Sequence, residues 1–157
     1  MRVGFSGTRD GMTDAQKTAL TKWVCRNMIA EWHHGNALGA DEEAVMIVAD
    51  WLVRRPPVIA AHPSDVPESG SASAYILSHE KHPPKRPLVR NWDIVDASAV
   101  LLATPAGPEE VRSEVWATIR YARKLARHIV IIWPDGSTTE ENPPATPLSP
   151  PSETGRR

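Results

Sequence analysis

The 157-residue sequence has little cysteine: Cys25 stands alone, so no disulfide can form within the chain. Disulfides are rare in the reducing cytosol, and the composition therefore fits a cytoplasmic protein. Cys25 lies within a helical pattern, which predicts a small buried residue there. The N-terminal residues MRVGFSGTRD contain no long apolar stretch, so we predict no signal peptide.

The sequence also has no excess of charge of one sign and no long hydrophobic run. Eighteen basic and 19 acidic residues give a net charge of -1. Proteins that hold long nucleic acids by charge are usually basic over a large face, so nucleic acid is not expected as a partner. A single nucleotide needs only a local site. No apolar run approaches the roughly 20 residues of a membrane span, and we expect no membrane partner.

Short apolar strands alternate with amphipathic helices over residues 1–136. We expect strands at 2–6, near Trp32, at 57–61, 99–103 and 128–133, and helices at 13–31, 41–53 and 109–127, with a helical turn at 90–97 that faces Trp92 inward. This alternation is typical of one α/β domain, a Rossmann-like three-layer α/β/α fold with a mostly parallel sheet.

Two segments do not fit this periodicity. Residues 64–87 form a long polar loop, and the sequence leaves open whether it holds a short helix near 72–79 or acts as a lid. Residues 137–157 are rich in Pro, Ser and Thr without a periodic apolar face, which predicts a disordered tail.

Four stretches follow the carboxyl ends of predicted strands, and a parallel sheet would bring them to one edge. They are Ser6-Gly7-Thr8-Arg9, Gly35-Asn36-Ala37-Leu38-Gly39-Ala40-Asp41, His62-Pro63 and Thr104-Pro105-Ala106-Gly107. Ligands of such sheets bind beyond these strand ends. The first stretch offers backbone N–H groups, two hydroxyls and a guanidinium to an anion, next to a helix N-terminus. A tight turn with a surface arginine remains the alternative.

The other polar stretches also have two interpretations each. Asp41 either caps a helix or accepts hydrogen bonds from a ribose or base. The run Arg90-Asn91-Trp92-Asp93 suits a phosphate and a base face, or it is a capped helix with Trp92 in the core. The run from Arg112 to Thr118 either lines a site or faces solvent.

The six histidines do not predict a metal site. His33 and His34 are adjacent, so in a strand they point to opposite faces. The others, His62, His79, His82 and His128, are scattered, and no Cys/His spacing is typical of zinc. We therefore expect neither a metal nor another cofactor.

Seven segments together resemble the SLOG superfamily of Rossmann-like domains over residues 1 to about 136. They are GFSGTR, HHGNALGAD, HP, RNWDIVDAS, LLATP, EVWATIRYARK and IVIIWPDG. The superfamily includes the Lonely Guy enzymes, DNA-processing proteins that bind single strands, and nucleotide-sensing modules of phage defence; small bacterial and phage members look most similar. The resemblance implies a nucleotide pocket at the strand ends. Residues 6–9 would form its first loop, Gly39 and Asp41 its second, and Thr104 with residues 112–118 a phosphate-facing helix start.

One motif departs from the Lonely Guy pattern. Those enzymes resemble P-G-G-x-G-T-x-x-E, where the glutamate acts in glycosidic cleavage, whereas this chain has PAGPEEVRSEVWAT. Thr118 stands where the glutamate should be, and a threonine cannot stabilise an oxocarbenium-like centre as a carboxylate does. Glu114, one turn earlier, could supply a carboxylate, although its charge would repel a phosphate there.

The function expected from these observations is binding of a nucleotide or an ADP-ribose-like derivative, as a sensor or sequestering module. The alternative is an N-glycosidic-bond hydrolase acting on a nucleoside or nucleotide, with Glu114 as the catalytic carboxylate; Asp41 and Asp93 are further candidates. A third possibility, single-stranded DNA binding, requires a basic groove. The six tryptophans predict a homo-oligomer, because aromatic residues are enriched at interfaces. The residues expected to contact the ligand are Ser6, Gly7, Thr8, Arg9, Gly39, Ala40, Asp41, His62, Arg90, Asn91, Asp93, Thr104, Pro105, Arg112, Ser113, Trp116 and Thr118.

Overall fold

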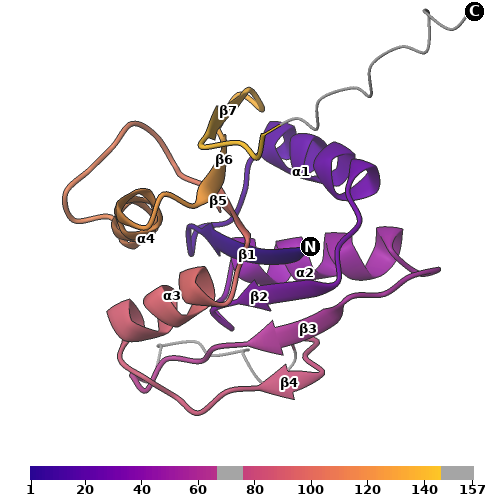
Figure 1. Cartoon of the computed structure of the whole chain (residues 1–157), viewed down its shortest axis with the longest axis horizontal. Coiled ribbons are helices and arrows are strands. Elements are labelled where there is room, and N and C mark those ends of the chain that lie inside the picture. Colours follow the sequence, from indigo (N-terminus) through magenta and orange to yellow (C-terminus); the bar gives the residue numbers. More distant parts are fainter. Residues whose placement is uncertain (67–75, 146–157) are drawn as a thin grey trace, which may run out of the picture.

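Seven strands form one sheet in the order β4-β3-β2-β1-β5-β6-β7, in a computed structural model that describes residues 1–66 and 76–145 (Figure 1). Every neighbouring pair is parallel except β6 and β7, which are antiparallel. The strands are β1 (Arg2–Gly7), β2 (Glu31–His34), β3 (Val58–Ala61), β4 (Glu80–Lys81), β5 (Val100–Thr104), β6 (His128–Ile132) and β7 (Thr138–Glu141). The helices are α1 (Asp14–Arg26), α2 (Ala40–Trp51), α3 (Pro87–Asp96) and α4 (Glu114–Lys124).

Two helices cover each face of the sheet. α1 and α2 pack together on one face, and α3 and α4 pack together on the other (Figure 1). The strand β5 shows why: Leu102 packs into the α1–α2 core, whereas Leu101 and Ala103 pack into the core under α4. All five residues of β5 are buried, as expected of a parallel strand covered on both sides. The predicted three-layer, Rossmann-like architecture is confirmed.

Gln16 connects the start of α1 to two strand ends. Thr13 is the N-cap, and its hydroxyl and the Gln16 side chain complete a capping box. The buried Gln16 Nε2 also donates to the carbonyl oxygens of Pro105 (2.9 Å) and Ile132 (3.0 Å). The residues just beyond β5 and β6 are thereby held against α1.

The replacement Gln16→Ala should therefore lower the free energy of unfolding by about 2–4 kcal/mol, because it leaves two buried carbonyl groups without a donor. Chemical denaturation monitored by circular dichroism would measure the loss. The control Lys22→Ala, at an exposed position of the same helix, should change stability by less than about 0.5 kcal/mol. Equal effects of the two replacements would contradict this account of α1.

Helix ends differ from the sequence prediction for local reasons. α1 stops at Arg26 rather than near 31, because Asn27 is extended (φ -124°, ψ 145°) and directs the chain into β2. α3 starts earlier than expected, at Pro87, since proline suits the first helical position. Two burial predictions were wrong: Cys25 is exposed, and the Trp92 side chain is 42% exposed beside Tyr121.

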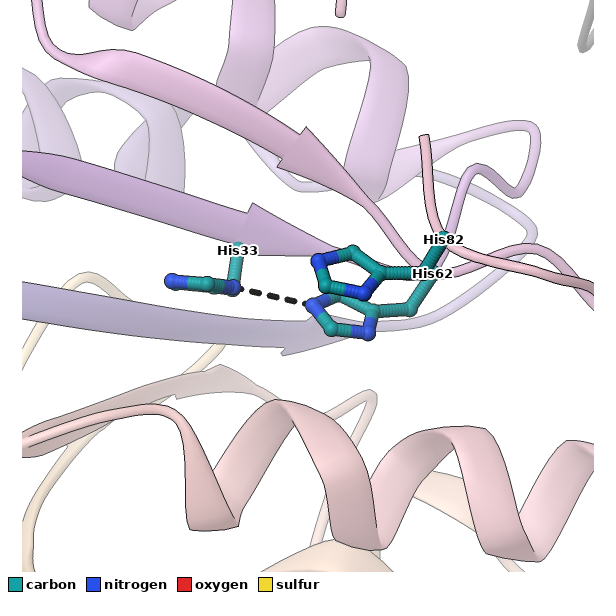
Figure 2. Close-up of side chains that lie close together, drawn as sticks. All are labelled: His33, His62 and His82. Atoms are coloured by element: carbon teal, nitrogen blue, oxygen red, sulfur yellow. Dashed lines mark hydrogen bonds between the residues drawn. The ribbon is translucent and has the colours of Figure 1, made fainter. Parts of the chain in front are cut away.

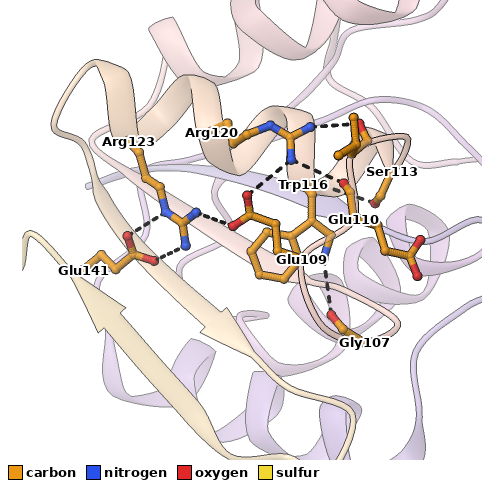
Figure 3. A network of polar contacts seen from close by, with 9 residues as sticks. Gly107, Glu109, Glu110, Ser113, Trp116, Arg120, Arg123 and Glu141 are labelled. Atoms are coloured by element: carbon orange, nitrogen blue, oxygen red, sulfur yellow. Dashed lines mark hydrogen bonds and ion pairs between the residues drawn. The ribbon is translucent and has the colours of Figure 1, made fainter.

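The predicted helix 109–127 was also too long. Residues 109–113 form a loop, in which Val111 is 89% exposed, and α4 begins only at Glu114. Polar contacts from α4 hold this loop (Figure 3). Arg120 donates to the Val111 carbonyl at 3.1 Å, and Arg123 pairs with Glu109 at 2.8 Å. Because these contacts are polar, no pattern of apolar residues in the sequence distinguishes this ordered loop from the helix.

The segment predicted to be a disordered tail contains β7, so that prediction was wrong for residues 138–141. Arg123 donates to both carboxylate oxygens of Glu141, at 2.8 and 2.9 Å, and Trp133 Nε1 donates to Thr139 Oγ1 at 2.8 Å. The strand reads TTEE and is mostly exposed, so hydrophobic periodicity could not reveal it. Residues 146–157 lie outside the described residues.

The segment 64–87 also contains a strand, β4, which the sequence did not predict. Residues 72–75 of the possible helix near 72–79 lie outside the described residues, and residues 76–79 are not helical. Within residues 1–66 and 76–145, no helix is both long and apolar enough to cross a membrane.

Candidate functional site

The carboxyl ends of β1 and β5 meet at the point where the sheet changes winding direction. Gly7 pairs with Thr104 at these ends. The chain leaves β1 toward α1 on one face and leaves β5 toward α4 on the other (Figure 1). The two connections diverge, and open α/β sheets place their ligands in the crevice that results.

Two of the predicted loops are in direct contact beside this crevice. Ala40 N donates to the Thr8 carbonyl at 3.0 Å. Gly39 has a φ of +81°, and a Cβ atom there would clash with the carbonyl group of Arg9. Gly39 and Ala40 therefore hold the loop 6–9 in place. Position 39 requires a glycine, because the two loops pack too closely for a side chain there.

The N-terminus of α1 is occupied by the protein itself. Met12 N donates to Glu43 Oε1 at 2.7 Å, Thr13 N to Gln16 Oε1 at 3.0 Å, and Gln16 N to Thr13 Oγ1 at 3.0 Å. Thr8 Oγ1 donates to the Gly11 carbonyl at 3.0 Å, within the turn before the helix. An anion at this edge would consequently lie nearer the end of β1 than the start of α1.

Asp41 shapes the loop that follows β2. Its Oδ2 atom accepts hydrogen bonds from the backbone N–H groups of Gly35 (3.0 Å) and Ala37 (3.2 Å). Asp41 is 6% exposed and begins the first turn of α2. The capping interpretation was wrong, because Gly39 is the N-cap of α2 and no side chain caps this helix. The Asp41 carboxylate instead organises the loop after β2, and Asp41 lines the cavity described below.

Arg90 is a buried cation at the same edge, only 4% exposed. Its Nε donates to Asn91 Oδ1 at 2.8 Å, and its Nη1 donates to the carbonyl oxygens of Gly35 and His62, the latter at 3.3 Å. A Cβ atom on Gly35 would lie 2.9 Å from Nη1, so the missing side chain admits the guanidinium. These contacts fix the guanidinium plane, which a flexible ammonium could not reproduce.

A small cavity of about 30 Å³ lies between these elements. It is lined by Phe5, Ser6, Gly7, Arg9, Gly35, Ala37, Asp41, Arg90, Asn91, Ile94 and Glu114. Arg9 and Glu114 form an ion pair across it at 3.6 Å, and their side chains are 53% and 47% exposed. Seven of the residues predicted from sequence, from four separate segments, therefore meet at one place.

Other predicted residues lie elsewhere. Thr104 is buried beneath the loop 6–9, where its hydroxyl has no hydrogen-bond partner. The carbonyl of buried Pro105 accepts from Gln16, and Asp93 pairs with Lys85 at 2.6 Å on an exposed face. Arg112 is exposed in the loop before α4. None of these four side chains lines the cavity.

The start of α4 is mostly structural. Ser113 is the N-cap and accepts from Trp116 N at 3.3 Å. Trp116 is 3% exposed in the core, and its Nε1 donates to the Gly107 carbonyl at 3.3 Å (Figure 3). Thr118 is 1% exposed and donates to the Glu114 carbonyl at 2.9 Å. Of this segment, only Glu114 reaches the cavity.

Three histidines gather beside the cavity, which sequence reasoning missed. His33 lies within β2, His62 directly follows β3, and His82 directly follows β4 (Figure 2). His33 Nδ1 lies 2.9 Å from His62 Nε2, and the rings of His62 and His82 stack with centroids 4.1 Å apart. Burial lowers the pKa of His62 to about 3, and the neighbouring His82 acts in the same direction. The available signal was a histidine beside the carboxyl end of each of two adjacent parallel strands, with His33 one residue before the end of β2 and His62 one residue after the end of β3.

A larger hollow of about 740 Å³ lies elsewhere, along α1 and the β6–β7 hairpin. Its lining includes Met1, Lys22, Trp23 and His128, which lie near the amino ends of β1 and β6. It collects none of the predicted site residues. The convergence of strand-end loops, rather than cavity size, identifies the carboxyl edge as the candidate site.

No protein-family model and no curated protein matches the sequence. Solved structures with a similar fold include the following two. DNA processing protein A from Streptococcus pneumoniae has a TM-score of 0.59 and 18% identity, over 94% of this chain and 51% of that one. The structural-genomics protein TM1055 has a TM-score of 0.52 and 12% identity, over 82% of this chain and 72% of that one.

These likenesses concern the fold. The chain has a Rossmann-like fold, as expected from the resemblance of its motifs to the SLOG superfamily. It spans about half the length of DNA processing protein A. At 18% and 12% identity, neither structure transfers a ligand or an activity to this chain.

Proposed function

We propose that this protein binds a nucleotide or a nucleotide-derived, ADP-ribose-like molecule at the carboxyl edge of its sheet, as a sensor or sequestering module. One observation carries the proposal: the loops after β1 and β2, helix α3 and the first residue of α4 converge on a cavity where the sheet changes winding direction, with the buried Arg90 in its wall. The SLOG-like fold is consistent with a nucleotide-related role.

The charges around the cavity support a mixed ligand. Arg9 and Arg90 suit an anionic group, and guanidinium groups pair well with phosphate. Asp41 and Glu114 are acceptors for hydroxyl groups, such as those of a ribose. A phosphate-bearing sugar combines both features.

The size of the cavity implies that binding changes the site. A volume of about 30 Å³ holds one small group, so most of a nucleotide would lie over the rim. The ion pair between Arg9 and Glu114 spans that rim and would have to separate. Exposed ion pairs contribute about 0–1 kcal/mol, so a ligand could open this one at little cost.

The replacement Glu114→Gln should accordingly tighten binding of an anionic nucleotide by about two- to fivefold, because it removes a negative charge that repels the ligand and that pairs with Arg9. Isothermal titration calorimetry with the wild type and the variant would measure the change. The matched control is Glu110→Gln in the preceding exposed loop, which should leave affinity unchanged. Weaker binding by Glu114→Gln would contradict this role for the pair.

The second candidate function is N-glycosidic cleavage, favoured by the position of the Glu114 carboxylate in the cavity wall. This proposal expects slow release of free base from a nucleoside or nucleotide by the wild type. It also expects Glu114→Gln to abolish release while binding persists. If high enzyme concentrations release no base from a nucleotide panel, the binding function stands without the hydrolase activity.

The expected partners form part of the same proposal. We still do not expect the protein to bind nucleic acid, because acidic partners neutralise the arginines of α4. Arg120 and Arg123 pair with Glu109, and Arg123 also pairs with Glu141. A cytoplasmic location is retained from the cysteine content.

Self-association also remains a proposal. The exposed Met46, Trp51 and Val53, at 60%, 60% and 70%, offer a second copy an apolar contact near the end of α2. Light scattering at high concentration should show an oligomer that Trp51→Ser weakens, and a wild-type monomer would refute self-association.

A further inference from the structure

Three imidazole groups converge at the carboxyl ends of β2, β3 and β4 (Figure 2). His33, His62 and His82 each offer one ring nitrogen, and these three nitrogens lie within 4.8 Å of one another. His33 and His62 are 5% and 3% exposed, whereas His82 is exposed. The rings of His33 and His62 are therefore held within the protein, whereas the ring of His82 is open to solvent.

A carboxylate orients the ring of His33. Glu31 Oε2 lies 3.0 Å from His33 Nε2, two residues earlier on the same strand. With the Nε2 proton donated to Glu31, the lone pair of His33 Nδ1 points toward His62 Nε2, 2.9 Å away. Metal-binding histidines commonly donate their other N–H to a carboxylate in this way, which fixes the tautomer and raises ligand basicity.

We propose that His33, His62 and His82 bind one divalent transition-metal ion of the Zn²⁺ class, with Glu31 as the carboxylate behind His33. Imidazole nitrogens suit Zn²⁺, Co²⁺ and Ni²⁺, and three histidines leave a fourth position for water or a ligand. Tetrahedral Zn²⁺ with bonds of about 2.0–2.1 Å needs nitrogens about 3.3 Å apart. The His33–His62 pair is close to that separation, and the stacked, exposed ring of His82 has room to turn.

The simpler explanation is a neutral histidine pair joined by a hydrogen bond. That explanation accounts for His33 and His62 but gives no role to His82, whose ring stacks on His62 from a separate strand end. It also predicts that a metal ion binds no better here than at any exposed histidine. The two explanations therefore differ in a measurable affinity.

The site is separate from the cavity but linked to it. Arg90 Nη1 donates to the His62 carbonyl at 3.3 Å, so one residue carries a contact to each site. Metal binding requires no nucleotide. It can therefore be tested on the protein alone, and its failure would leave the proposed nucleotide function intact.

The experiment uses full-length protein without an affinity tag, treated with chelator and dialysed. Titration with Co²⁺, followed by its visible absorption, and with Zn²⁺, followed by calorimetry, should show one equivalent bound in the micromolar range or tighter. His82→Ala should weaken binding at least tenfold, and Glu31→Gln by about 10–100-fold. The control is His128→Ala, at a histidine on β6 that pairs with Glu140, which should leave binding unchanged.

His82 is the key position, because its exposure makes misfolding of the variant easy to avoid and circular dichroism would verify the fold. His62→Ala provides a second variant that removes a buried ligand. Absence of binding at 100-micromolar metal, or equal affinity of the wild type and both histidine variants, would overturn the site and leave the hydrogen-bonded pair.

Discussion

The replacement Arg90→Lys is expected to weaken binding of an anionic nucleotide at least tenfold. The guanidinium lines the cavity while its Nε and Nη1 groups are held by Asn91 Oδ1 and by the carbonyls of Gly35 and His62. Lysine keeps the charge but loses the planar arrangement of donors that matches a phosphate. Calorimetry with the wild type and the variant would measure the difference.

Stability must be measured in parallel, because Arg90 is buried. Loss of the fixed hydrogen bonds should lower the free energy of unfolding by about 1–3 kcal/mol, which leaves a protein of this size folded. Arg86→Lys is the matched control, since Arg86 is exposed just before the same helix and should change neither quantity. Unchanged nucleotide affinity in folded Arg90→Lys would exclude Arg90 from the ligand site.

The replacement Gly39→Ala is expected to lower the free energy of unfolding by about 2–4 kcal/mol. Two independent causes add: Gly39 has a φ of +81°, which alanine adopts only with strain, and a Cβ atom would clash with the carbonyl group of Arg9. At about 2–4 °C per kcal/mol, the melting temperature should fall by about 5–15 °C. Differential scanning calorimetry would measure it.

Gly107→Ala separates this effect from any general cost of replacing glycine. Nothing lies within 4 Å of a Cβ atom on Gly107, and its φ is not positive. That replacement should be neutral or slightly stabilising. Because Gly39 supports the loop 6–9, Gly39→Ala should also weaken nucleotide binding. A melting temperature equal to that of Gly107→Ala would contradict the close packing of the two loops.

Much of the fold was predictable because its strands are buried on both faces. In a domain of this size, the apolar runs at β5 and β6 fit only buried strands. The alternation of strands and helices then predicts a parallel sheet. The sheet edges were not predictable. β4 has two exposed residues and β7 has mostly exposed ones, and hydrogen bonds and ion pairs hold them without an apolar signal.

The candidate site shows the same division. Topology alone brings Ser6, Arg9 and Asp41 to one edge, since parallel strands end together. The orientation of side chains was beyond reach: Trp116 and Thr118 face the core because α4 starts only at Glu114. The histidine cluster depends on which strands are neighbours, and His82 enters it through β4, which carries no periodic signal.

An ¹H–¹⁵N NMR titration with AMP, ADP and ADP-ribose at millimolar concentration tests the central claim most directly, because it reports both binding and place. The account predicts that at least one of these ligands shifts the amide signals of residues 6–9, 35–41 and 90–91. Signals along α1 and β7, which line the larger hollow, should stay in place. No shifts with any of these nucleotides, or shifts confined to α1 and β7, would contradict a nucleotide site at the carboxyl edge of the sheet.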